Sequence, residues 1–212
     1  MTLDWRWLGR VGYAEAVREM EDRRTKLIDG DGSASSVLLC EHPPVITLGR
    51  RADRGHVRAS DSVLRELGVA VIDTPRGGEV TYHGPGQLLI YPVVRLRRGL
   101  VRYLEAVAAA IIETAEQLGV HGAAWRRDPA VVWIDGAKLA ACGVHVRRQV
   151  AIHGFALNVS TPESVWQLIV PCGLRAEQVT SLASRLGRAC PAVEQVARIA
   201  GPKLSRRLAH VT

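Results

Sequence analysis

The sequence lacks any apolar stretch approaching the roughly 18 consecutive residues that a membrane-spanning helix needs, so no membrane partner is predicted. Residues 1–10 carry Asp4, Arg6 and Arg10 with no apolar segment behind them, which argues against a secretory signal. There is also no internal repeat and no low-complexity linker. With 212 residues, the chain is long enough for one well-buried domain and short for two, so we expect a single cytoplasmic domain.

Cysteine is scarce and scattered. The four cysteines form no CxxC pair and no His/Cys cluster at metal-ligand spacing, and the glycines match neither the dinucleotide fingerprint nor the P-loop. We therefore expect no metal and no cofactor. Without an export signal, free thiols are favoured over two disulfides, and a free thiol serves either as a small core residue or as a nucleophile.

Aromatic residues are also few, at 5% of the chain, and none interleave with the paired arginines as a base-stacking surface would require. The net charge of +7 suits an acidic partner. Nucleic acid is therefore disfavoured, and an acidic carrier protein is the better match. Solvated surface arginines account for most of the remaining charge.

Lysine is the rarest cation, since only Lys26, Lys138 and Lys203 occur among the 28 lysines and arginines. Arginine keeps its proton near neutral pH, whereas a desolvated lysine can lose it. Lys138 begins a predicted strand and precedes the apolar run Leu139–Ala141, where burial would lower its pKa toward the range of proton transfer. The alternative is a strand-end lysine that reaches solvent.

The apolar pattern predicts an α+β domain with a mixed β-sheet and flanking helices. The strongest helical pattern spans residues 101–118 and stops at Gly119. Other helices are predicted over residues 13–27, from Thr161–Pro162 to about residue 169, and from residue 192 onward with a break at Gly201–Pro202. Strands are predicted over residues 36–40, 45–48, 69–72, 88–94, 131–134, 138–146 and 150–159.

Two segments carry residue types suited to chemistry. In Pro171–Cys172–Gly173, the proline and glycine flank a loop thiol that is well placed to attack a thioester, although a buried loop cysteine without a role is equally compatible. Cys40 and Cys142 lie in strands and look structural, and Cys190 lies in a loop without supporting residues. In residues 76–87, four glycines leave bare backbone that can approach a ligand, unless they only form a hairpin turn.

These segments belong to ordered blocks by which the chain resembles the lipoyl(octanoyl) transferases, also called octanoyl-acyl-carrier-protein:protein N-octanoyltransferases. The blocks are residues 39–51, 76–88, 138–143, 153–158, 169–173 and 180–182. The resemblance implies the fold of the biotin and lipoate protein ligases and a single octanoyltransferase catalytic domain over residues 1–212. Two positions depart from the family pattern. Cys142 replaces a larger aliphatic residue and should slightly widen the acyl pocket, and Val131 replaces a glycine.

The resemblance also implies roles for individual residues. Cys172 would form an acyl-thioester intermediate, and Lys138 would lower the pKa of that cysteine and act as acid and base. Backbone N–H groups near Cys142–Gly143 or Gly77–Gly78 would hold the oxyanion. The residues expected to line the substrate are Arg76, Gly77, Gly78, Glu79, Val80, Thr81, Tyr82, His83, Ala141, Cys142, Gly143, His153, Gly154, Phe155 and Ala156.

The implied reaction moves an octanoyl group from octanoyl-acyl carrier protein to a lysine of a lipoyl domain, as the first step of endogenous protein lipoylation. The expected acceptors are the lipoyl domains of 2-oxoacid dehydrogenase complexes and the glycine cleavage H protein. One alternative is an ATP-dependent lipoate or biotin ligase of the same fold, which would need no cysteine. Another is a non-catalytic module that binds acyl groups or carrier proteins.

Overall fold

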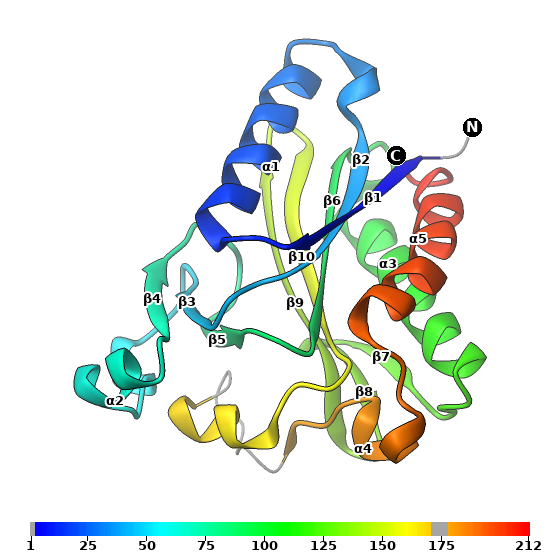
Figure 1. Ribbon diagram of the computed structural model, residues 1–212. Coiled ribbons are helices and arrows are strands. Elements are labelled where there is room, and N and C mark those ends of the chain that lie inside the picture. The colour runs from blue at the N-terminus through cyan, green and yellow to red at the C-terminus, as the bar shows by residue number, and fades with distance from the viewer. Residues whose placement is uncertain (1–2, 171–177) are drawn as a thin grey trace.

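The computed structural model describes residues 3–170 and 178–212 and contains two sheets within that part of the chain (Figure 1). The seven-stranded sheet has the order β1-β2-β6-β10-β9-β8-β7, and the three-stranded sheet has the order β4-β3-β5. The large sheet comprises β1 (Asp4–Arg10), β2 (Ser36–Glu41), β6 (Gln87–Arg95), β7 (Ala124–Arg127), β8 (Ala130–Ile134), β9 (Ala137–Arg147) and β10 (Val150–Asn158). The small sheet comprises β3 (Val45–Leu48), β4 (Ala70–Asp73) and β5 (Val80–His83).

Both sheets are mixed. In the large sheet β1 pairs with β2 in parallel and the other neighbours are antiparallel, while in the small sheet β3 is parallel to β4 and antiparallel to β5. The helices are α1 (Tyr13–Ile28), α2 (Asp61–Glu66), α3 (Gly99–Gln117), α4 (Ala183–Leu186) and α5 (Val193–Leu208), with 3-10 turns η1 (Gly32–Ala34), η2 (Arg54–His56), η3 (Glu163–Leu168) and η6 (Gly187–Ala189). The predicted α+β class with a mixed sheet is confirmed.

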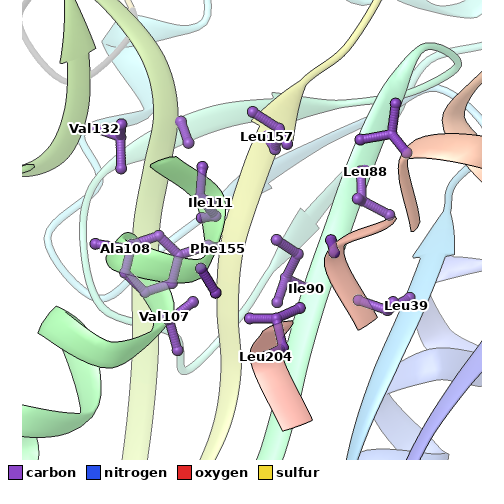
Figure 2. Close-up of a cluster of buried hydrophobic side chains, with 14 of the residues drawn as sticks. Leu39, Leu88, Ile90, Val107, Ala108, Ile111, Val132, Phe155, Leu157 and Leu204 are labelled. Atoms are coloured by element: carbon purple, nitrogen blue, oxygen red, sulfur yellow. The ribbon is translucent and has the colours of Figure 1, made fainter. Parts of the chain in front are cut away.

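The main core lies between one face of the large sheet and the helices α3 and α5 (Figures 1 and 2). The apolar positions at three-and-four spacing in α3, among them Val107 and Ile111, meet Phe155 of β10 and Ile90 of β6 in a fully buried cluster. Each such side chain contributes about 1.5–3 kcal/mol to the free energy of folding. The periodicity in the sequence therefore located this core directly.

Helix α1 covers the opposite face of the large sheet, where Met20 and Leu27 pack on Leu89 and Tyr91 of β6. The small sheet lies to one side with a core of its own, in which Leu64 of α2 and Trp166 of η3 are buried. Residues from both sheets and from α1 meet at the cavity described below. Within the described ranges no helix is long and apolar enough to cross a bilayer.

Two sequence-based predictions about helices are wrong in detail. Helix α5 runs without a break through Gly201 and Pro202, because residues on both sides, among them Ala200 and Leu204, pack in the main core. The segment after Pro162 forms the 3-10 helix η3 and not an α-helix. The Thr161 hydroxyl does not cap that helix, since it donates to the Gly86 carbonyl at 3.2 Å.

Candidate functional site

A cavity lies on the α1 face of the large sheet, and its floor is made of very small side chains. Ala141 of β9 lies opposite Ala156 of β10, and Gly143 lies opposite Gly154. Directly paired residues of antiparallel strands share a face of the sheet. Four neighbouring positions with no side chain larger than a methyl group therefore leave a hollow above the sheet. We call this hollow the inner cavity, and it measures about 450 Å³ including its open mouth.

Most of the residues expected to line the substrate surround the inner cavity. Its lining consists of Tyr13, Arg76, Gly78, Thr81, His83, Leu89, Tyr91, Ala141, Cys142, Gly143, His153, Gly154, Phe155 and Ala156. Among the expected residues, Gly77, Glu79, Val80 and Tyr82 are absent from it. Alternation along β5 explains two of these, because Thr81 and His83 border the cavity while Val80 and Tyr82 pack in the core of the small sheet.

A second hollow adjoins the first and contains Lys138. This outer cleft measures about 1050 Å³ including open solvent, and it shares Gly78, Ala141, Cys142 and Gly143 with the inner cavity. Its other lining residues are Arg51, Gly77, Glu79, Leu100, Leu104, residues 127–131, Lys138 and Val144. Lys138 therefore lies on the same strand, β9, as the floor residues Ala141 and Gly143 of the inner cavity.

A β-bulge places Lys138 on the cavity side of β9. The register of β8 with β9 shifts between Val132 and Trp133, so that Lys138 pairs with Trp133 and Ala140 with Val132. Leu139 and Ala140 consequently both pack in the main core. Lys138 then shares the opposite face with Ala141, which strict alternation would forbid. Lys138 is only 5% exposed, so the alternative of a strand-end lysine that reaches solvent does not hold.

A chain of hydrogen bonds links Lys138 to the wall of the inner cavity. Gln87 Oε1 accepts from His83 Nδ1 at 2.6 Å, and Gln87 Nε2 donates to Asn158 Oδ1 at 3.0 Å. Asn158 Nδ2 donates to the Thr180 carbonyl at 3.0 Å, and the Thr180 N–H donates to the Lys138 carbonyl at 2.9 Å. Blocks far apart in the sequence thus meet at one site. Gln87 and Asn158 stood in those blocks, but nothing in the sequence indicated that they bond to each other.

The far end of the inner cavity is lined by aromatic and imidazole rings. Tyr13 stacks on His83 and on His153 with ring centroids 6.3 and 6.4 Å apart, and Tyr91 meets His153 edge to face at 6.2 Å. The Tyr13 hydroxyl donates to Thr74 Oγ1 at 2.9 Å. No sequence pattern pointed to Tyr13 or Tyr91, although a tyrosine in the otherwise aliphatic strand β6 is a weak signal.

Burial keeps the histidines of this cluster neutral. It lowers the pKa of His83 well below its usual value and lowers that of His153 to about 3, with the nearby Arg76 charge acting in the same direction. Burial also lowers the pKa of His42, whose Nδ1–H donates to the Val11 carbonyl at 2.7 Å and whose Nε2 accepts from Tyr91 at 3.0 Å. None of these imidazoles therefore takes up a second proton and becomes positively charged at neutral pH.

The neutral histidines predict acid-sensitive folding. The unfolded chain protonates its histidines below about pH 6.5 while folded His153 stays neutral down to about pH 3, so the unfolded state binds more protons in between. Stability is therefore complete above that window and falls as the pH drops through it. His153 alone should cost about 2 kcal/mol between pH 6.5 and 5. Urea unfolding of the wild type and of a His153→Gly variant at both pH values measures this effect. An equal loss of unfolding free energy in the two proteins between pH 6.5 and 5 would contradict it.

The cysteines within the described residues do not fit a nucleophile. Burial raises the pKa of the Cys142 thiol to about 12, and it also raises the pKa values of Cys40 and Cys190. Cys142 packs against the main core, which agrees with the structural role expected for it. Cys172 lies outside the described residues.

Arg76 holds the glycine-rich segment in place. Its guanidinium is buried and donates to Thr47 Oγ1 and the Thr47 carbonyl, and also to the carbonyls of Gly77 and Glu79, at 2.6–3.0 Å. The Gly77 N–H donates to the Val144 carbonyl at 3.0 Å, so it is not available to an oxyanion. That these glycines approach a ligand stays a prediction. Gly84 and Gly86 pack against Tyr82 and Ser160, and Gly78 is the glycine of this segment that borders both hollows.

The chain matches the family model of the lipoyl protein ligase A/B catalytic domain over residues 14–201. It is 47% identical to the octanoyltransferase of Solibacter usitatus, over 84% of this chain and 81% of the relative. It is 42% identical to the mitochondrial octanoyl-acyl-carrier-protein:protein N-octanoyltransferase of Xenopus tropicalis, over 86% and 78%. An octanoyltransferase of Myxococcus xanthus is 44% identical over 88% of this chain, which spans 54% of that relative.

Solved structures confirm the expected fold. The bi-partite lipoate protein ligase of an archaeal lipoylation system from Thermoplasma acidophilum has a TM-score of 0.75 at 14% identity, over 99% of this chain and 84% of that chain. Biotin protein ligase from Aquifex aeolicus has a TM-score of 0.57 at 14% identity, over 97% and 70%. At such identities the likeness concerns the fold alone. The family model and the sequence relatives, however, show that the chain belongs to the lipoyl protein ligase A/B catalytic-domain family and is an acyltransferase of the octanoyltransferase group.

Proposed function

We propose that the chain transfers an octanoyl group from octanoyl-acyl carrier protein to a lysine of a lipoyl domain through a thioester on Cys172. The observation that carries the proposal is the inner cavity, which has a small-residue floor and opens beside the buried Lys138. Its surface is mostly apolar, and each methylene buried there contributes about 0.8 kcal/mol. A saturated acyl chain is therefore a suitable occupant.

In the first half-reaction, the Cys172 thiolate attacks the carbonyl carbon of the carrier thioester while the Lys138 ammonium stabilises the negative charge. The new carbon–sulfur bond forms, the bond to the carrier sulfur breaks, and Lys138 gives its proton to the leaving thiolate. In the second half-reaction, the neutral amine of the acceptor lysine attacks the enzyme thioester. Lys138 takes the proton of that amine, the amide forms, and the Cys172 thiolate is released.

The outer cleft offers an approach for both partners. Arg51 and Arg127 lie at its rim, together with Asp128 and the partly exposed Glu79, and Leu100 is an exposed apolar residue beside them. An acidic carrier protein would be attracted by the overall charge of +7. The proposed acceptors are the lipoyl domains of 2-oxoacid dehydrogenase complexes and the glycine cleavage H protein.

Intact-protein mass spectrometry after mixing the enzyme with octanoyl-acyl carrier protein alone tests the thioester route. We expect one octanoyl group, mapped to Cys172 and released by hydroxylamine. A Cys172→Ala variant should form no adduct and should lose turnover, whereas Cys190→Ala should behave as the wild type. Turnover by Cys172→Ala would refute the scheme.

The same measurement separates the two other candidate functions. Absence of an adduct on the folded protein, with activity only when ATP and free octanoate are supplied, would identify an ATP-dependent ligase. Stoichiometric binding without turnover, unaffected by substitution of Cys172 or Lys138, would identify a binding module. The octanoyltransferase relatives favour the transferase over both.

A further inference from the structure

His153 adopts a backbone conformation that is unusual for its residue type. It lies inside strand β10 with φ of +58°, in the left-handed region that side chains other than glycine rarely enter. Such a residue costs on the order of 1–3 kcal/mol and persists where the surrounding structure or the function requires it. The register of β10 with β9 continues through this point, with Val144 opposite His153, so the distortion does not end the strand.

The left-handed conformation sends the His153 ring to the cavity side of the sheet. Its neighbours Ala151 and Phe155 pack in the main core, and strict alternation would send His153 there too. Instead its ring lies against Tyr13 of α1 and Tyr91 of β6, and it borders the inner cavity. The His153 N–H donates to Met20 Sδ of α1 at 3.3 Å.

Hydrogen bonding does not explain why the imidazole is there. The residue is only 2% exposed, and in the part of the chain that the structure describes its Nε2 atom has no hydrogen-bond partner. By contrast, Tyr13, His83 and Tyr91 each hold a side-chain hydrogen bond, to Thr74, Gln87 and His42. A strained residue with an unsatisfied buried nitrogen requires another reason, and the position of its ring in the cavity wall supplies one.

The distance from Ala141, where the two hollows meet, to His153 is close to the length of an octanoyl chain. Ala141 borders both hollows, and His153 lies across from Val144, three residues further along β9. Three residues at about 3.3 Å and one strand spacing of about 4.8 Å separate them by roughly 11 Å. An extended octanoyl chain spans roughly 9 Å from its carbonyl carbon to its methyl carbon, because each of its seven bonds of about 1.5 Å advances a zigzag chain by only about 1.3 Å. The ring of His153 thus lies near the methyl end of such a chain.

We propose that His153 is the specificity-determining residue that ends the acyl-binding cavity and limits the bound chain to about eight carbons. The proposal rests on the proposed function, because it assumes that the acyl chain occupies the inner cavity. It assigns His153 no part in proton transfer. It gives the strain in β10 a role, since only a left-handed residue at this position places a ring across the cavity.

A series of carrier proteins loaded with octanoyl, decanoyl or dodecanoyl chains tests this. The rate of enzyme acylation is measured by intact mass for the wild type, His153→Gly and His153→Asn. Glycine and asparagine both tolerate the left-handed conformation, so neither variant adds backbone strain. Each buried methylene is worth about fourfold in affinity, so room for two more should raise the decanoyl-to-octanoyl rate ratio of His153→Gly about 15-fold. His153→Asn should fall between it and the wild type.

His145→Ala is the matched control, because His145 lies on β9 outside the lining of both hollows and bonds to Arg24. It should leave the rate ratio unchanged. An unchanged ratio in both His153 variants, with the rate for every chain lowered equally, would overturn the proposal. A wild-type enzyme that takes no octanoyl group from the carrier would instead refute the proposed function.

Discussion

Replacing Lys138 with methionine is expected to lower kcat/KM for octanoyl transfer by about 10³-fold without unfolding the protein. Methionine has a similar length and suits a site that is only 5% exposed. The variant loses the positive charge that would stabilise the Cys172 thiolate and the group that would exchange protons in both half-reactions. Acid–base catalysis by one positioned side chain is worth about 10²–10⁴-fold. The measurement is steady-state transfer to an apo lipoyl domain.

A Lys138→Arg variant separates charge from proton transfer. Arginine keeps the positive charge but does not release its proton near neutral pH. It should retain part of the rate of enzyme acylation, followed by mass, and lose most of the transfer to the lipoyl domain. Lys26→Met, at an exposed lysine paired with Asp22, is the matched control and should be fully active. Wild-type rates in both half-reactions for Lys138→Met would exclude a catalytic role for this lysine.

The elements that the sequence predicted are those whose apolar pattern is regular. Helix α3 and strands β2, β6 and β10 are recovered within two residues because their buried positions repeat at the helical or strand period, or run continuously. The short strand β7 was missed because Ala124–Arg127 is mostly exposed and carries two arginines. The helix break expected at Gly201–Pro202 is absent because burial of residues on both sides, such as Ala200 and Leu204, in the main core favours a continuous helix.

The site could be predicted only as a set of segments. The ordered blocks of the sequence contain residues 76–83, 141–143 and 153–156, and most of these residues border one cavity. Local sequence could not show the bulge that turns Lys138 toward it. Nor could it show the left-handed turn at His153, since both depend on pairing with neighbouring strands. Tyr13 joins the site only through the packing of α1.

Replacing Arg76 with methionine is expected to lower the free energy of unfolding by about 3–5 kcal/mol and to abolish transfer. The change would remove the donor that now bridges the buried Thr47 carbonyl and the part-buried carbonyls of Gly77 and Glu79, of which the Glu79 carbonyl keeps a hydrogen bond from the Gly49 N–H. Each group that stays unsatisfied costs about 1–3 kcal/mol. The glycine-rich segment would then lose its position over β9, and with it one wall of both hollows.

Urea unfolding and transfer assays on Arg76→Met, Arg76→Lys and Arg50→Met measure this effect. Lysine keeps the charge but lacks the planar fork that reaches several acceptors at once, so Arg76→Lys should also be destabilised, though less. Arg50 is an exposed residue whose backbone N–H donates to the Arg76 carbonyl, so Arg50→Met removes a guanidinium from the same contact region without exposing a buried acceptor. It should change stability by no more than about 0.5 kcal/mol. If Arg76→Met proved as stable as Arg50→Met but inactive, the guanidinium would act on the substrate directly and not by holding the segment in place.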